Sequence, residues 1–80
     1  MTRKEMYERL NRVFQEVFDD ASIVVNDDTT ANDIDNWDSM MHITLIGSIE
    51  EEFNIKFTMK NVISIQNVGQ MADMIMERAD

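Results

Sequence analysis

Apolar side chains recur at steps of three and four residues along much of this chain, and that spacing predicts α-helices. The first such stretch extends from about Arg3 to Phe18, and Thr2 and Glu5 have the spacing of a capping box at its start. Its apolar stripe consists of Tyr7, Leu10, Val13, Phe14, Val17 and Phe18. The chain contains no proline and two glycines, so its composition also favours helices.

Three later segments are also expected to be helical. The second helix should begin at Ser39, a residue type preferred at helix starts, and continue to about residue 53. Thr58 can cap a short third helix that ends at about Val62, and Asn67 can cap a last helix that ends at about Arg78. The inward-facing residues of the last helix are Val68, Met71, Ile75 and Met74.

Residues 19–38 are predicted to form a long loop, because Asp and Asn side chains that favour turns crowd this segment. Its expected apolar anchors are Ile23, Val24, Val25, Ile34 and Trp37. The predicted fold class is therefore all-α: a small four-helix bundle with a long loop between helices one and two and a short third helix. We expect a single domain that spans residues 1–80.

The size and composition of the chain limit what it can do. A chain of eighty residues buries only a thin core, so a carrier, adaptor or binding role is expected rather than catalysis. The absence of cysteine excludes disulfides and thiolate metal sites. No segment is as apolar as a signal peptide or a membrane span, which favours a cytoplasmic protein with no membrane partner.

The net charge of −9 is concentrated in one part of the chain. Residues 21–55 carry eight acidic side chains and neither lysine nor arginine. Such a block repels nucleic acid and anionic membranes and favours basic protein partners. A solvated surface that only aids solubility is the other interpretation.

The second helix has two different faces when its residues are placed about 100° apart. The arc expected to face the core contains Leu45, Ile46, Ile49, Phe53 and His42. The opposite arc contains Met40, Ile43, Thr44, Gly47, Glu50 and Glu51. Exposed apolar groups beside carboxylates indicate a docking surface for partner proteins. Alternatively, Met40 and Ile43 cover loop residues such as Ile34 or Trp37.

The segment Asp38-Ser39-Met40, followed by this apolar helix, resembles the Asp-Ser-Leu signature of acyl carrier proteins. The segments at residues 55–58 and 67–71 also resemble the family's entries into its third and last helices, so the resemblance covers essentially the whole chain. Met40 replaces the usual Leu, and Asn36-Trp37 replaces the common Gly and small apolar residue. The Trp-Asp-Ser form is more similar to stand-alone carriers of specialised pathways than to fatty-acid carriers.

The resemblance implies that a phosphopantetheinyl transferase attaches 4'-phosphopantetheine, taken from coenzyme A, to Ser39. Asp38 would be presented to the transferase. The thiol of the arm would hold an acyl or aminoacyl group as a thioester, which a monomeric carrier loads from a ligase or transferase and presents to downstream biosynthetic enzymes. An apolar cargo would find room among the expected core residues Leu10, Phe14, Leu45, Ile49, Phe53 and Ile75. Neither cargo nor pathway follows from the sequence.

Three other functions compete with that of a carrier. A hydrolase built from Asp38, Ser39 and His42 is disfavoured. In a catalytic triad the carboxylate orients the histidine while the histidine contacts the serine, and residues this close on one helix turn cannot easily adopt that arrangement. An EF-hand beginning at Asp27 or Asp33 lacks the glycine at position six, so a calcium sensor is disfavoured and no metal site is expected. A helical adaptor that shares the acidic face and is never modified remains the alternative.

Overall fold

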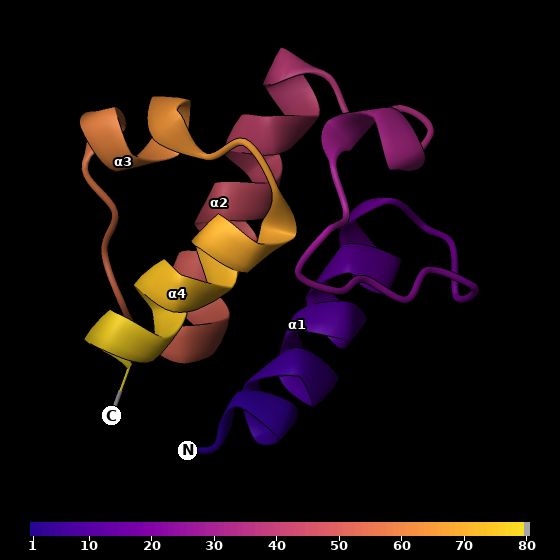
Figure 1. Cartoon of the computed structure of the whole chain (residues 1–80). Coiled ribbons are helices and arrows are strands. Elements are labelled where there is room, and N and C mark those ends of the chain that lie inside the picture. Colours follow the sequence, from indigo (N-terminus) through magenta and orange to yellow (C-terminus); the bar gives the residue numbers. More distant parts are fainter. Residues whose placement is uncertain (80) are drawn as a thin grey trace.

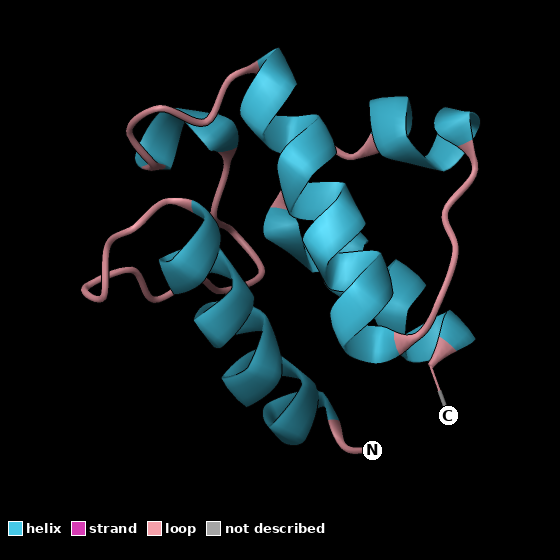
Figure 2. Cartoon of the chain, turned by 180° about the vertical axis from the view of Figure 1, so that it is seen from behind, coloured by secondary structure: helices cyan, strands magenta, loops and turns pink. Residues whose placement is uncertain are grey.

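The computed structural model describes residues 1–79, and these residues form four α-helices joined by loops (Figures 1 and 2). The helices are α1 (Arg3–Val17), α2 (Ser39–Phe53), α3 (Met59–Ser64) and α4 (Val68–Arg78). The long connection between α1 and α2 contains one short 3-10 turn, η1 (Ala31–Asp33). The predicted all-α bundle with a long first loop and a short third helix is confirmed.

Local capping explains where most helices begin. At α1, the backbone N–H of Glu5 donates to the Thr2 hydroxyl (3.1 Å), and the backbone N–H of Thr2 donates to the Glu5 carboxylate (2.8 Å). Thr58 and Asn61 form the equivalent box at α3, and the Asn67 side chain caps α4. α3 ends at Ser64, two residues later than expected, and none of its residues is buried.

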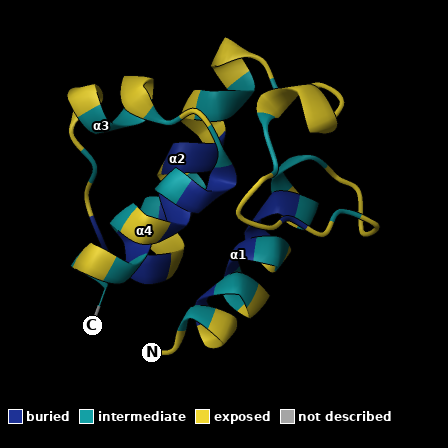
Figure 3. Cartoon of the chain, viewed as in Figure 1, coloured by how far each residue is buried: buried dark blue, intermediate teal, exposed yellow. Residues whose placement is uncertain are grey.

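The core lies where α1, α2 and α4 face one another, as the buried segments in Figure 3 show. All six expected core residues are buried, and so are Val13, Ile46, Val68 and Met71. Met6 and Ala72 are fully buried but were not expected, because a methionine and an alanine stand out little in an apolar pattern. Tyr7, expected in the stripe, is half-buried, and its hydroxyl donates to the carboxylate of Asp27.

Backbone hydrogen bonds attach the long loop to the start of α4. The N–H groups of Val68 and Gly69 at the start of α4 donate to the carbonyl oxygens of Thr29 (2.8 Å) and Asp27 (3.0 Å). Val25 is buried, but Val24 is 76% exposed, so the expectation that Val24 anchors the loop is wrong. Neighbouring residues in extended backbone point to opposite sides, so burial of one exposes the other.

Within residues 1–79, no helix is both long enough and apolar enough to span a lipid bilayer.

Candidate functional site at the start of α2

Ser39 is the first residue of α2, and its side chain is exposed. The residue that caps the helix is Asp38, whose extended backbone lets its carboxylate accept a hydrogen bond from the N–H of Met41 at 2.9 Å. The expectation that Ser39 itself serves as the cap is therefore wrong. The correction matters chemically, because among residues 1–79 the Ser39 hydroxyl is committed to no hydrogen bond.

The position of Ser39 also suits an anion. The first backbone N–H groups of an α-helix have no partner within the helix, and the helix dipole makes this end partly positive. A phosphate group esterified to the Ser39 hydroxyl would lie beside these donors. In Figure 1 this end of α2 lies between α3 and the η1 turn, at the edge of the molecule.

The loop enters α2 through a strained residue and an aromatic cluster. Asn36 has a φ of 72°, in the left-handed region that asparagine tolerates better than most residues. The next residue, Trp37, packs edge-on against Phe14 with ring centroids 5.4 Å apart and lies beside Phe18. The tryptophan thereby anchors the loop to α1 directly before the site.

His42, expected on the core-facing arc, is half-buried and bonded at both ring nitrogens. The indole N–H of Trp37 donates to its Nδ1 at 3.1 Å, and its Nε2 lies 3.1 Å from the carbonyl oxygen of Val62 in α3. Because both nitrogens are engaged with these groups, neither is free to take a proton from Ser39. This arrangement agrees with the rejection of a hydrolase.

A cavity of about 510 Å³ opens beside Ser39, between the start of α2, α3 and the link from α3 to α4. Its polar lining residues are Asp38, Ser39, His42, Gln66 and Asn67. Its apolar lining residues are Ala31, Trp37, Ile43, Met59, Val62, Ile63 and Ile65. A larger hollow of about 770 Å³ lies within the acidic loop, but Ser39 is not among its lining residues. The smaller cavity is therefore the one that belongs to the candidate site.

A family model described as a phosphopantetheine attachment site matches residues 8–75. The chain belongs to this family of carrier domains. It is also similar to a holo acyl carrier protein from Geobacter metallireducens, solved by solution NMR, with 43% sequence identity and a TM-score of 0.84. That match covers 90% of this chain and 83% of the other. No curated protein matches the chain.

The chain is thus an acyl carrier protein, of the family whose members hold a covalently attached 4'-phosphopantetheine arm, and a carrier rather than an enzyme. The residues at the start of α2 fit such an arm. Ser39 offers an accessible hydroxyl at a helix N-terminus, where a phosphodiester anion is favoured. The adjacent cavity has apolar walls against which the aliphatic part of an arm or cargo can pack.

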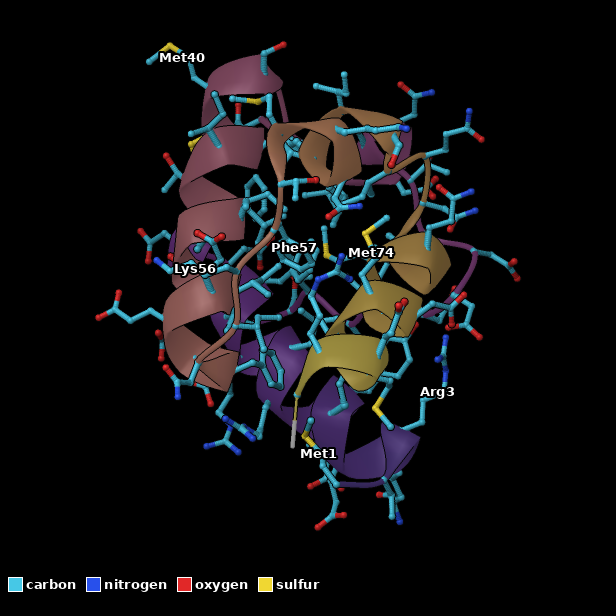
Figure 4. All side chains as sticks on the ribbon, turned by 90° about the vertical axis from the view of Figure 1, so that its left-hand side faces the viewer. Met1, Arg3, Met40, Lys56, Phe57 and Met74 are labelled. Atoms are coloured by element: carbon cyan, nitrogen blue, oxygen red, sulfur yellow. The ribbon has the colours of Figure 1, made fainter. Side chains whose placement is uncertain are left out.

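The carrier exposes most of the face of α2 that was expected to dock partners. Met40 is 80% exposed and projects from the end of α2 in Figure 4, and Ile43 is 65% exposed, so neither covers the loop. Thr44, Gly47 and Glu51 are also exposed. Glu50 differs: it is half-buried, and its carboxylate accepts a hydrogen bond from the backbone N–H of Phe57 at 2.8 Å.

Sequence reasoning missed two residues that extend this face. Met59 and Ile63 of α3 are 73% and 76% exposed, and both line the cavity beside Ser39. They are four residues apart on a helix that buries nothing, a spacing that could have indicated a second apolar face.

Proposed function

We propose that this acyl carrier protein bears its arm on Ser39 and presents a thioester-linked acyl group to successive partner enzymes. The observation that carries the proposal is that Asp38 caps α2, which leaves the exposed Ser39 hydroxyl available for modification. Helices α1 to α4 and the first loop serve as one carrier domain around this residue. The adaptor alternative shares the fold but requires that Ser39 stay unmodified.

The residues of the chain have distinct roles in this proposal. Ser39 provides the oxygen that is esterified by a phosphopantetheinyl transferase, and the free N–H groups of the first turn of α2 stabilise the resulting anion. Asp38 holds the first turn in place and adds a carboxylate that a basic transferase can recognise. When bound, the arm supplies the thiol that carries the cargo as a thioester. The chain itself has no cysteine to compete for acyl groups.

The cavity beside Ser39 bears on the class of cargo. Because seven of its twelve lining residues are apolar, burial of an aliphatic acyl chain is favoured over burial of a charged aminoacyl group. The docking face, defined as Met40, Ile43, Thr44, Gly47, Glu50 and Glu51, meets this cavity at Ile43, which is one of its lining residues. Partners that dock there would have basic and apolar patches and would meet the cargo as it leaves the cavity.

The attachment site can be tested by intact-mass measurement. Incubation of the chain with coenzyme A and a broad-range phosphopantetheinyl transferase should add the mass of one phosphopantetheine. Ser39→Ala should add none and should remain folded, because its hydroxyl takes no part in capping. Ser64→Ala is the matched control, since Ser64 is also exposed and should leave modification unchanged. An unmodified wild type would favour the adaptor, and a modified Ser39→Ala would move the site elsewhere.

A further inference from the structure

His42 joins three parts of the carrier at the wall of the cavity. From α2, His42 accepts a hydrogen bond from the indole N–H of Trp37 at the end of the loop. Its other ring nitrogen lies within hydrogen-bond distance of the carbonyl oxygen of Val62 in α3. The imidazole and indole rings are also stacked, with centroids 5.9 Å apart and planes at 24°. Val62 lies in the last turn of a six-residue helix, where carbonyl oxygens have no partner within the helix.

The two hydrogen bonds require one particular form of the imidazole. An indole N–H can only donate and a carbonyl oxygen can only accept. Nδ1 must therefore be bare and Nε2 must carry the hydrogen, which is the neutral ring. A proton added to Nδ1 would place an N–H against the indole N–H of Trp37. The Nε2–H bond to Val62 would survive, so protonation breaks the bond to Trp37 selectively.

Few charged groups surround the imidazole. Among the described residues that line the cavity from the loop, α2, α3 and the α3–α4 link, Asp38 is the one other titratable side chain. Its carboxylate is engaged by the N–H of Met41. On α3, Lys60 is exposed and lies outside the lining, and Arg78 of α4 donates to the side chain of Asn61.

We propose that His42 is a positioning residue that holds Trp37 in the cavity wall while neutral and releases it when protonated. Trp37 is half-buried, and its ring packs against Phe14. An indole N–H that has lost its acceptor would turn toward water, because an unpaired donor is costly away from solvent. That movement would open the cavity wall between the loop and α2. The use of this opening by an arm or cargo rests on the proposed function. The hydrogen-bond switch does not.

The test uses NMR on the full, unmodified chain between about pH 5 and pH 8, the range in which imidazoles ordinarily titrate. Exchange of the Trp37 indole proton with water is measured and corrected for the pH dependence of free tryptophan. We expect corrected exchange to become roughly fivefold or more faster as the ring protons of His42 titrate, with the same midpoint. An indole whose exchange does not change through that titration would overturn the proposal.

Two substitutions separate the hydrogen bond from His42 to Trp37 from the one to Val62. In His42→Asn the amide oxygen takes the place of Nδ1, so the indole should exchange slowly at both ends of the pH range. In His42→Gln the amide nitrogen takes the place of Nε2, so the indole should exchange fast at both ends. A pH step that persists in His42→Asn would contradict the proposal. If a variant fails to fold, the wild-type titration alone decides.

The outcome can be separated from that of the attachment experiment. The same titration on Ser39→Ala, which cannot bear an arm on that residue, should give the wild-type result. Failure of the switch would leave the Ser39 proposal standing, and failure of modification at Ser39 would leave the switch intact.

Discussion

At the scale of single residues, the two glycines of the carrier have opposite structural roles. Gly69 lies at the start of α4, where a β-carbon would lie 2.7 Å from the carbonyl oxygen of Asp27. That oxygen is also the acceptor for the Gly69 N–H, so the loop and α4 approach as closely as a hydrogen bond requires. Gly47 lies exposed in the middle of α2, where a β-carbon would meet no neighbouring atom within 4 Å.

Alanine at each position should therefore have opposite effects on stability. Gly69→Ala should lower the free energy of unfolding by about 1–3 kcal/mol, because the backbone of the loop must move. Gly47→Ala should raise it by about 0.5–1 kcal/mol, because alanine loses less conformational entropy in a helix. Urea titrations of the three proteins measure both effects. An unchanged midpoint for Gly69→Ala would show that the loop yields without cost.

At the scale of elements, the link between α2 and α3 depends on a residue from the docking face. The carboxylate of Glu50 accepts a hydrogen bond from the backbone N–H of Phe57 and so orders the chain between the two helices. Figure 4 shows Phe57 on this link, directed toward α4, and its ring lies 5.6 Å from the guanidinium carbon of Arg78. A substitution of Glu50 would thus change structure as well as surface charge, which makes Glu51 the better probe of docking.

Glu51→Lys should slow phosphopantetheine transfer if basic partners use the docking face. We expect the rate to fall roughly three- to tenfold at low ionic strength and the difference to shrink at high salt, because exposed charges are screened. Glu77→Lys is the control, since Glu77 is exposed on α4 and the change in net charge is identical. Equal rates for the two variants under both conditions would mean that only the total charge matters.

The elements themselves could be predicted from the sequence, but the contacts between them could not. Helix starts could be predicted because capping joins residues that are three apart in the sequence. Thr58 and Asn61 are such a pair, and they bond through side-chain and backbone groups. The start of α2 at Ser39 was predicted correctly, but its capping residue was not, because Asp38 and Ser39 are both good caps and only the backbone decides between them. The bonds from Glu50 to Phe57 and from His42 to Val62 join polar groups whose meeting depends on the tertiary fold.

At the scale of the whole molecule, one polar cluster joins the first helix, the loop and the last helix. Arg3 of α1 forms ion pairs with Asp27 of the loop at 2.8 Å and with Asp73 of α4 at 2.9 Å. A hydrogen bond from Tyr7 and, as the next largest cause, one from Arg3 hold the pKa of Asp27 below its ordinary value. Burial, followed by the bond to Asp27, raises the pKa of Tyr7.

These shifts give a direction to the pH dependence of stability. Because the pKa of Asp27 is lowered in the folded state, its stabilising effect is present above the ordinary carboxyl pKa and is lost as the pH falls through the lowered value. The raised pKa of Tyr7 makes its effect present below the ordinary phenol pKa and lost as the pH rises through the raised value.

Asp27→Asn should accordingly lower the thermal midpoint by a few degrees at pH 7 but make little difference at a pH below the lowered pKa of Asp27, where the wild-type carboxylate is itself protonated. Thermal unfolding at the two pH values measures this. Asp28→Asn is the matched control, since Asp28 is the exposed neighbour and its substitution should matter at neither pH. A deficit of equal size at both values would rule out a role for the charge of Asp27.

The chain has a single tryptophan, and that residue lies in the wall of the cavity next to the attachment serine. Entry of an acyl chain into the cavity would replace water around the indole with hydrocarbon. Its ultraviolet emission would then shift to shorter wavelength without any added dye. A carrier of this design would allow its loading and discharge to be followed in real time, on the native sequence, in a simple fluorimeter.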